Sequence, residues 1–215
     1  METLERDIRG ATRAHRFSES CLGGLTDDAA RRPSLLPGWT VGHVLAHIAL
    51  NAESHVGMLE AANRGEVAVQ YPGGRAQRDA AIEEGAGLSA EALVARVAAA
   101  NAELEACWAA MTAEGWMGQG ETASGPVEVA DLPFRRWRET TVHHTDLGLC
   151  HGWADWPADY VRLDLQRLTM LWDSRRPMGL TGLPAAALAV SENHRLAWML
   201  GRADIDGLAP AGLMQ

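Results

Sequence analysis

The stretch TVGHVLAHIALNAESH, residues 40–55, carries the periodicity that decides the fold of this chain. Its apolar residues recur at intervals of three and four, the spacing of one face of an amphipathic α-helix; they are Val41, Val44, Leu45, Ile48 and Ala52. Thr40 stands directly before them, and threonine is one of the residues that cap helix N-termini. The stretch therefore predicts a helix that begins after Thr40 and reaches about Arg64.

Helical patterns continue on both sides of this helix. The helices that they predict span about 2–22, 88–112, 131–152 and 158–175, with a last helix around 192–200. We expect residues 71–87 to be a loop with at most one helical turn, and the alternating segment PVEVA at 126–130 to be a short strand or hairpin. Asp131 is expected to cap the fourth long helix, with Pro133 just inside its first turn.

Four long helices joined by loops of moderate length predict an all-α fold, a four-helix bundle with a short hairpin insertion. At 215 residues the chain has room for one good core and a small appendage. We therefore expect residues 1–152 to form the bundle, and residues 153–215 to form a short, mainly helical C-terminal extension packed on it.

The composition argues against several classes of protein. A formal net charge of -9 argues against nucleic acid or an anionic membrane as partner, because both require a basic surface. No window approaches the ~18 apolar residues of a membrane span, and the first residues lack the pattern of a secretory signal, so we expect a cytoplasmic protein. The cysteines form no CxxC pair, which argues against a disulfide framework. Small molecules and proteins remain as partners.

The spacing of histidine and glutamate indicates a metal site. Glu139 and His143 are four residues apart and therefore project from one face of their helix. A third ligand is available on the second long helix. A helical-wheel count places His47 at the edge of the apolar stripe, with His43 nearer to solvent and His55 in a different layer of the bundle. His47 is therefore the preferred third ligand.

The adjacent His144 does not belong to this set, because consecutive helical residues point about 100° apart and cannot both face one ion. The residues by themselves leave two interpretations open. Isolated pairs of this kind also occur on ordinary polar helix faces. A metal-binding bundle and a metal-free helical interaction protein are both compatible with the pattern.

Two segments resemble a known family. LPGWTVGHVLAHIALNAES at 36–54 and FRRWRETTVHHTDLGL at 134–149 resemble the two signature segments of the mycothiol-dependent maleylpyruvate isomerase family, within the DinB-like group of metal-binding four-helix bundles. The resemblance extends to RDAAIEEGAG at 78–87 and to RLAWMLGRADIDGL at 195–208. It implies a DinB-like bundle for this chain.

The resemblance also implies the cofactors. His47, Glu139 and His143 would ligate a divalent metal, most often zinc, and the small-molecule thiol would be mycothiol. Three protein ligands leave one coordination position open, and a thiol bound there loses its proton readily. The thiolate would add to an electrophilic small molecule. It would then leave, as in the cis-trans isomerisation of maleylpyruvate, or stay attached, as in S-transfer.

Two arginines are candidates for substrate binding. One of the three arginines directly before Glu139 is expected to attract a carboxylate on the substrate or cofactor, together with Arg78. The three are Arg135, Arg136 and Arg138, and Arg138 is the candidate chosen. The alternative is that the arginines before Glu139 are solvated and pair within their own helix, as Arg135 would with Glu139.

Three other residues are candidates for supporting roles. Asp146 is expected to orient a ligating histidine, although a cap or an exposed position is an alternative. Asn51 and Trp39 are expected to face the cofactor, against the alternatives of an exposed helix residue and of aromatic packing. Trp137 is a further aromatic candidate beside the second signature segment.

Two expectations concern the molecule as a whole. The segment 175–201 looks shorter than the C-terminal α/β part usual in the family's enzymes, which contributes to their substrate side, so the resemblance does not fix the substrate of this chain. The alternative function is a non-catalytic, metal-stabilised bundle that acts in dimerisation or protein interaction. The chain would be a monomer or a homodimer.

Overall fold

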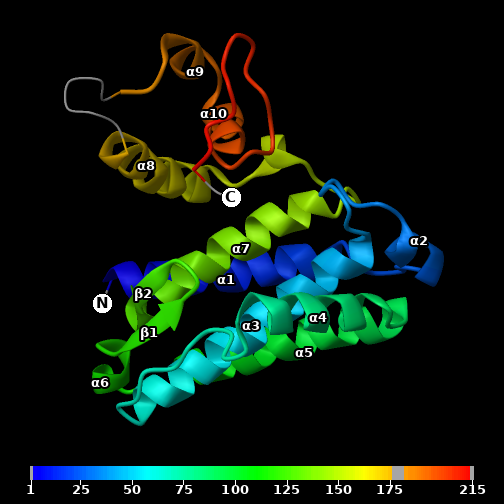
Figure 1. Ribbon diagram of the computed structural model, residues 1–215, viewed down its shortest axis with the longest axis vertical. Helices are drawn as coiled ribbons and strands as arrows, with labels where there is room; N and C mark the ends of the chain where they lie inside the picture. The colour runs from blue at the N-terminus through cyan, green and yellow to red at the C-terminus, as the bar shows by residue number, and fades with distance from the viewer. Residues whose placement is uncertain (1, 176–181, 214–215) are drawn as a thin grey trace. The chain divides into compact units, whose positions relative to one another are not determined.

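The computed structural model describes residues 2–175 and 182–213, and the chain divides into two compact units, Met1–Cys150 and His151–Gln215 (Figure 1). Residues 176–181, which belong to the C-terminal segment expected to be short, lie outside the described residues, as do residues 1 and 214–215. None of the described helices is both long enough and apolar enough to cross a membrane.

The first unit is a four-helix bundle, as predicted. Its long helices are α1 (Glu2–Ser20), α3 (Val41–Asn63), α5 (Ala90–Ala109) and α7 (Leu132–Asp146). Helix α1 packs against α7 and α5, and α3 packs against α5 and α7, so the four helices close a ring around one core (Figure 1). The apolar face of α3 is buried in that core, including Val44, Leu45 and Ile48, each fully inaccessible to solvent.

Helix α3 begins as its sequence predicts. The Thr40 side chain accepts a hydrogen bond from the His43 backbone N–H, while His43 Nδ1 accepts one from the Thr40 backbone N–H at 3.2 Å. This reciprocal cap satisfies two of the N–H groups that a helix start leaves free. The cap fixes the start of α3, and with it the positions of the histidines along this helix.

Helix α7 differs from its prediction at both ends. A 3-10 turn, η1 (Val129–Asp131), leads into it and gives Asp131 a helical backbone, so the Asp131 side chain makes no cap. Asp131 instead accepts a hydrogen bond from Arg135 at 3.0 Å. The helix ends at Asp146 rather than near residue 152, because Gly148 takes a positive φ of 65° that only glycine adopts readily.

The expected loop at 71–87 is mostly a helix, α4 (Gly74–Ala86), and that expectation was wrong. Most of its residues favour helices, but a helix of 13 residues is marginal in isolation, and only Ile82 and Gly85 are buried. Packing against α3 supplies the missing stability. A side chain at Gly85 would collide with Ala46 of α3, so the glycine permits the close contact.

Shorter elements connect the long helices. They are α2 (Asp27–Arg31), α6 (Ala113–Trp116) and a two-stranded antiparallel hairpin of β1 (Gln119–Thr122) and β2 (Gly125–Glu128). The hairpin is the one expected around PVEVA. It lies between α6 and η1 in the chain and leads directly into α7.

A glycine sets the contact between α1 and α7. A side chain at Gly10 would come within 2.2 Å of the Trp137 ring, so only glycine leaves room for that indole. Trp137 is 2% exposed and lies in the core. Its position there is the aromatic packing that the sequence left open as an alternative to ligand binding.

The second unit contains η2 (Trp153–Asp155), α8 (Ala158–Ser174), α9 (Ala185–Ala189) and α10 (Glu192–Met199). Helices α8 and α10 pack together, with the rings of Trp172 and Trp198 5.3 Å apart. Both helices follow their predicted bounds within one or two residues.

Candidate metal centre

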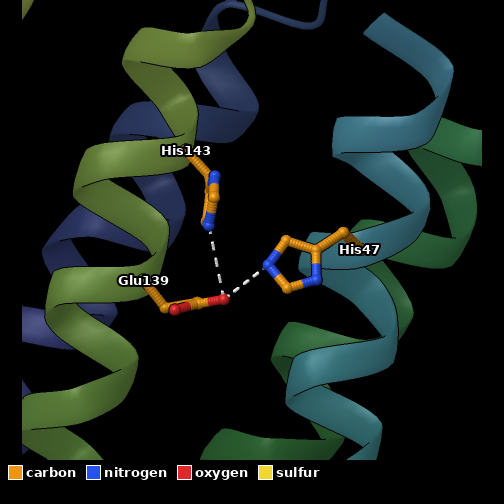
Figure 2. Close-up of side chains that lie close together, drawn as sticks. All are labelled: His47, Glu139 and His143. Atoms are coloured by element: carbon orange, nitrogen blue, oxygen red, sulfur yellow. Dashed lines mark ion pairs between the residues drawn. The ribbon is translucent and has the colours of Figure 1, made fainter. Parts of the chain in front are cut away.

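Three side chains from α3 and α7 converge on one point. His47 Nε2 lies 2.6 Å from Glu139 Oε1, and His143 Nε2 lies 3.5 Å from the same oxygen. Figure 2 shows the two imidazole rings directed at the carboxylate from different helices. Each residue offers one ligand atom, and these atoms lie within 4.8 Å of one another. Among the described residues this is the one group of three with that property.

His143 is held in the tautomer that a metal ligand needs. Its Nδ1 lies 2.8 Å from Asp146 Oδ2, and a carboxylate can only accept, so the ring hydrogen is on Nδ1. The Nε2 lone pair then faces Glu139. Asp146 is 2% exposed, which strengthens this charge-assisted bond. The structure thus places Asp146 beside His143, on the side away from the convergence point.

His47 has two further neighbours. Arg78 of α4 places Nη2 3.2 Å from His47 Nδ1, and its Nη1 donates to Asp79 at 2.8 Å. A guanidinium can only donate, so Nδ1 of His47 is the acceptor in this contact. The Trp39 ring lies edge-on to His47 at 5.5 Å between centroids, and it also stacks near His43. The helix missed in sequence, α4, therefore brings a cation to the centre.

The electrostatics of the centre favour ligating forms. Burial lowers the pKa of His47, although Glu139 opposes this effect. Burial would raise the pKa of Glu139, but His143 and His47 beside it hold that pKa well below its usual range. A neutral imidazole and an ionised carboxylate are the forms that bind metals.

The donor set fits a divalent transition metal. Two imidazole nitrogens and one carboxylate oxygen are a common set for a catalytic zinc, which keeps a further position open. The hydrogen bond from His143 to Asp146 is the kind of outer contact that accompanies metal-ligating histidines. The same set also suits other first-row metals, so the donors do not select zinc alone.

Several predicted residues lie elsewhere. Arg138 stacks over the Phe134 ring at 5.5 Å and so is not placed at the convergence point, because it precedes Glu139 by one residue and points about 100° away. Arg135 pairs with Asp131 and not with Glu139, contrary to the pairing considered from sequence. His144 faces α1, where its ring lies 5.1 Å from Phe17. His144 is thus outside the set, as expected.

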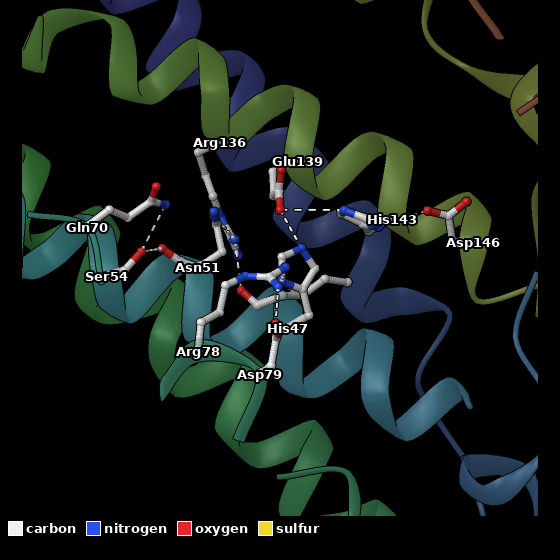
Figure 3. Close-up of polar contacts among 11 residues, drawn as sticks. His47, Asn51, Ser54, Gln70, Arg78, Asp79, Arg136, Glu139, His143 and Asp146 are labelled. Atoms are coloured by element: carbon white, nitrogen blue, oxygen red, sulfur yellow. Dashed lines mark hydrogen bonds and ion pairs between the residues drawn. The ribbon is translucent and has the colours of Figure 1, made fainter. Parts of the chain in front are cut away.

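Asn51 is buried rather than exposed, with 6% of its surface accessible. It lies one turn beyond His47 on α3, and its Oδ1 accepts a hydrogen bond from Arg136 at 2.9 Å (Figure 3). Beyond it, Ser54 Oγ accepts a hydrogen bond from Gln70 at 3.2 Å. A row of polar side chains therefore continues along α3 from the three converging residues.

The sequence grouped Arg136 with Arg135 and Arg138 and did not predict that it is buried. It is completely buried, yet it stands between Arg135 and Arg138 in a run that reads as one basic surface. Its position three residues before Glu139 was the available signal, since residues at that spacing share a helix face. Figure 3 shows its side chain reaching from α7 toward α3 beside the three converging residues.

Comparisons with known proteins agree with this geometry. Residues 11–148 match the family model described as the mycothiol maleylpyruvate isomerase N-terminal domain. The crystal structure of the mycothiol-dependent maleylpyruvate isomerase is similar with a TM-score of 0.83 and 25% identity. A crystal structure of a histidine-to-alanine mutant of that isomerase is similar with a TM-score of 0.81 and 23% identity. No curated protein matches the sequence.

These two structures correct one expectation from sequence. Each comparison covers 93% of this chain and 90% of the isomerase chain. A chain that lacked a large C-terminal part would leave a larger share of the isomerase uncovered. The expected shortening of the C-terminal extension is therefore wrong with respect to these two structures.

Proposed function

Because this chain belongs to the mycothiol maleylpyruvate isomerase N-terminal domain family, we propose that it is a metal- and mycothiol-dependent enzyme that acts on an electrophilic small molecule. The observation that carries this proposal is the convergence of His47, Glu139 and His143 beside the Arg78 guanidinium. The reaction is either a cis-trans isomerisation like that of maleylpyruvate or the transfer of the thiol to its substrate.

The three converging residues would hold the metal, with zinc as the first candidate. When bound, the metal supplies a positive charge that stabilises a thiolate over a thiol near neutral pH. Asp146 keeps the His143 Nε2 lone pair directed at the metal position. Burial keeps the His47 ring in its neutral, ligating form.

Arg78 would bind the anionic end of the substrate or cofactor. Coordination through His47 Nε2 puts the ring hydrogen on Nδ1, where the Arg78 guanidinium has no acceptor to meet. The two groups cannot keep their contact in that form, so the guanidinium turns to another acceptor. A carboxylate that arrives beside the centre would supply one, with the bidentate geometry that arginine prefers. Trp39 would cover the same side as an apolar wall.

The direct test compares thiols and substrates on the purified protein. We expect zinc to copurify in stoichiometric amount, and mycothiol, but not glutathione, to support consumption of maleylpyruvate or of a bimane electrophile. Recovery of free mycothiol after turnover identifies an isomerase, whereas a stable conjugate identifies an S-transferase. A metal-loaded protein that consumes neither substrate with either thiol would contradict the enzyme assignment and leave a metal-stabilised bundle.

Arg78→Gln tests the anion site separately. We expect KM for a carboxylated substrate to rise by about tenfold or more, with a smaller effect on an uncharged electrophile and no loss of bound metal. Arg75→Gln is the matched control, because Arg75 also lies on α4 but is exposed and pairs only with Asp79 in the described contacts. An equal rise in KM for Arg78→Gln and Arg75→Gln would contradict a substrate-binding role for Arg78.

A further inference from the structure

Arg136 makes hydrogen bonds to all three other helices of the bundle. From α7 its Nη1 donates to the Ile48 carbonyl at 2.8 Å and to Asn51 Oδ1 at 2.9 Å, both on α3. Its Nη2 donates to Asn101 Oδ1 on α5 at 2.7 Å, and its Nε donates to His15 Nε2 on α1 at 3.0 Å. One buried side chain therefore ties the four helices together.

The contacts of Arg136 with α3 flank the metal centre. Ile48 follows His47 directly, Asn51 lies one turn further, and on α7 Arg136 lies one turn before Glu139. The guanidinium thus joins the same pair of helices that the ligands join, one layer away. Its bond to the Ile48 carbonyl is the informative one, because a backbone oxygen cannot change rotamer. A shift of α3 by one residue, about 1.5 Å along its axis, would break it.

The partners of Arg136 are held in turn. Since Arg136 Nε can only donate, His15 Nε2 accepts, and His15 Nδ1 must carry the hydrogen that it donates to Glu105 at 2.9 Å. Asn101 Nδ2 donates to Glu19 at 2.7 Å. With Asn101 and His15 held by these carboxylates, the guanidinium has one position available to it.

The acceptors around Arg136 are all uncharged groups: one imidazole, one backbone carbonyl and two amides. A buried cation with no carboxylate bonded to it costs stability compared with an apolar side chain of similar size. Buried polar groups of this kind are best explained where they select one register over others. The register selected here is the one between α3 and α7.

We propose that Arg136 is a positioning residue of the metal centre, which holds α3 and α7 at the register in which His47 meets Glu139 and His143. The inference rests on the proposed metal site and is independent of the thiol step. It assigns Arg136 no contact with substrate or metal. It separates this arginine from its neighbours: Arg135 pairs with Asp131 of η1, and Arg138 stacks over Phe134 of α7.

The test measures metal affinity in Arg136→Met and in a matched control, Arg96→Met. Arg96 also anchors α3, through a bidentate bond to Glu53 at 2.8 Å, but it does so from α5 and leaves α7 untouched. Both variants are expected to melt at lower temperature than the wild type. We expect zinc affinity, measured by chelator competition, to fall about tenfold or more in Arg136→Met, and to stay within about twofold in Arg96→Met.

Cobalt substitution supplies a measurement that a loss of stability alone would not change. The absorption bands of bound Co²⁺ report ligand geometry, so they are expected to change in Arg136→Met and to match the wild type in Arg96→Met. Wild-type affinity and spectrum in Arg136→Met, or equal losses in both variants, would overturn the proposal. If Arg136→Met does not fold, Arg136→Lys retains the charge and a donor, and unchanged zinc affinity in it would overturn the proposal equally.

The outcome is distinguishable from that of the proposed function. A wild-type protein that binds zinc and shows the difference between the two arginine variants, yet consumes no substrate with mycothiol, supports the positioning role and contradicts the enzyme assignment. If the wild type consumes substrate with mycothiol but Arg136→Met keeps full zinc affinity, the enzyme assignment is supported and the positioning role of Arg136 is contradicted.

Discussion

Two polar clusters, one around Arg136 and one around Glu139, lie one turn apart between α3 and α7. They differ in how fully their donors and acceptors are paired. Around Arg136, the guanidinium meets acceptors on three helices, so the cluster is complete in itself. Around Glu139, two imidazole nitrogens and a carboxylate oxygen point at one another. His47 donates to Glu139 there, while His143 Nε2 and the carboxylate are both acceptors, and a cation is the natural partner for such a set once the His47 hydrogen is on Nδ1.

The difference shows how a buried site is distinguished from a structural network. Burial and polarity are common to both clusters, and so is the pair of helices. Saturation is what separates them. Each contact of Arg136 pairs a donor with an acceptor, whereas in the other cluster the lone pair of His143 Nε2 faces an oxygen of Glu139, which is itself an acceptor. The predictions below treat the two clusters separately, from the largest expected effect to the smallest.

Removing the charge at the convergence point should have the largest effect. Glu139→Gln keeps the shape of the side chain but replaces an anionic ligand with a neutral amide, so we expect zinc affinity to fall by more than about 100-fold. Chelator competition measures it. The metal-free variant should melt within a few degrees of the metal-free wild type, and exposed Glu128→Gln on the hairpin should bind zinc normally. Normal zinc binding by Glu139→Gln would contradict the assignment of a metal centre to these three residues.

Removing the partner of His143 should have the next largest effect. Asp146→Ala frees His143 Nδ1 and lets the ring turn or change tautomer, so we expect zinc affinity to fall about 10- to 100-fold. Asp146→Asn can still accept through its amide oxygen and should lose less. Isothermal titration with zinc gives both values. If alanine and asparagine behaved alike, the orienting role of Asp146 would be wrong.

The contact of Arg136 with His15 should show itself in the pH dependence of stability. Burial and the nearby arginines lower the pKa of His15 from 6.5 to about 2. The folded protein therefore keeps His15 neutral while the unfolded chain takes up a proton below pH 6.5, so stability falls as the pH falls through that value. His55, whose pKa burial lowers to about 3, contributes with the same sign.

His15→Gln isolates the first of these contributions. Glutamine can still accept from Arg136 and donate to Glu105, but it does not titrate. Between pH 7 and pH 5 we expect the wild type to lose roughly 2 kcal/mol more unfolding free energy than His15→Gln. Urea denaturation at the two pH values, with chelator present, measures the difference. Identical losses in the two proteins would mean that His15 is protonated in the folded state.

Arg138→Gln should have the smallest effect. The structure places this side chain over Phe134, so its removal is expected to cost about 0.5–1 kcal/mol of stability and to leave zinc affinity unchanged. Thermal unfolding and chelator competition suffice as measurements. A large loss of turnover with intact metal binding would restore Arg138 as a substrate-binding residue.

Local pattern was enough to predict the bundle and the three residues that converge in it. The period of α3 and the Glu139 to His143 spacing are properties of single helices, and a wheel count separated His47 from His43 because α3 buries the face that its apolar residues mark. The hairpin and the cap at Thr40 are equally local. Features of this kind persist because the rest of the fold agrees with them.

The features missed from sequence depend on partners far along the chain. Helix α4 is stabilised by α3, which its own residues do not reveal. Arg136 looks like Arg135 and Arg138 until burial separates them, and Asn51 looks like an exposed residue until its partner is known. Asp131 has the right residue type for a cap and the wrong backbone conformation.

The separation of the ligands along the chain has a consequence for folding. His47 lies on α3 and Glu139 on α7, with α4, α5 and the hairpin between them, so the proposed ligand set is complete only after that long loop has closed. A cation that binds only the closed form stabilises it by mass action, in proportion to the logarithm of its concentration. Contacts that are absent from the folding transition state slow unfolding and leave the folding rate unchanged, and we expect the metal contacts to be of this kind. Metal supply would therefore govern the lifetime of the folded chain more than the speed at which it forms.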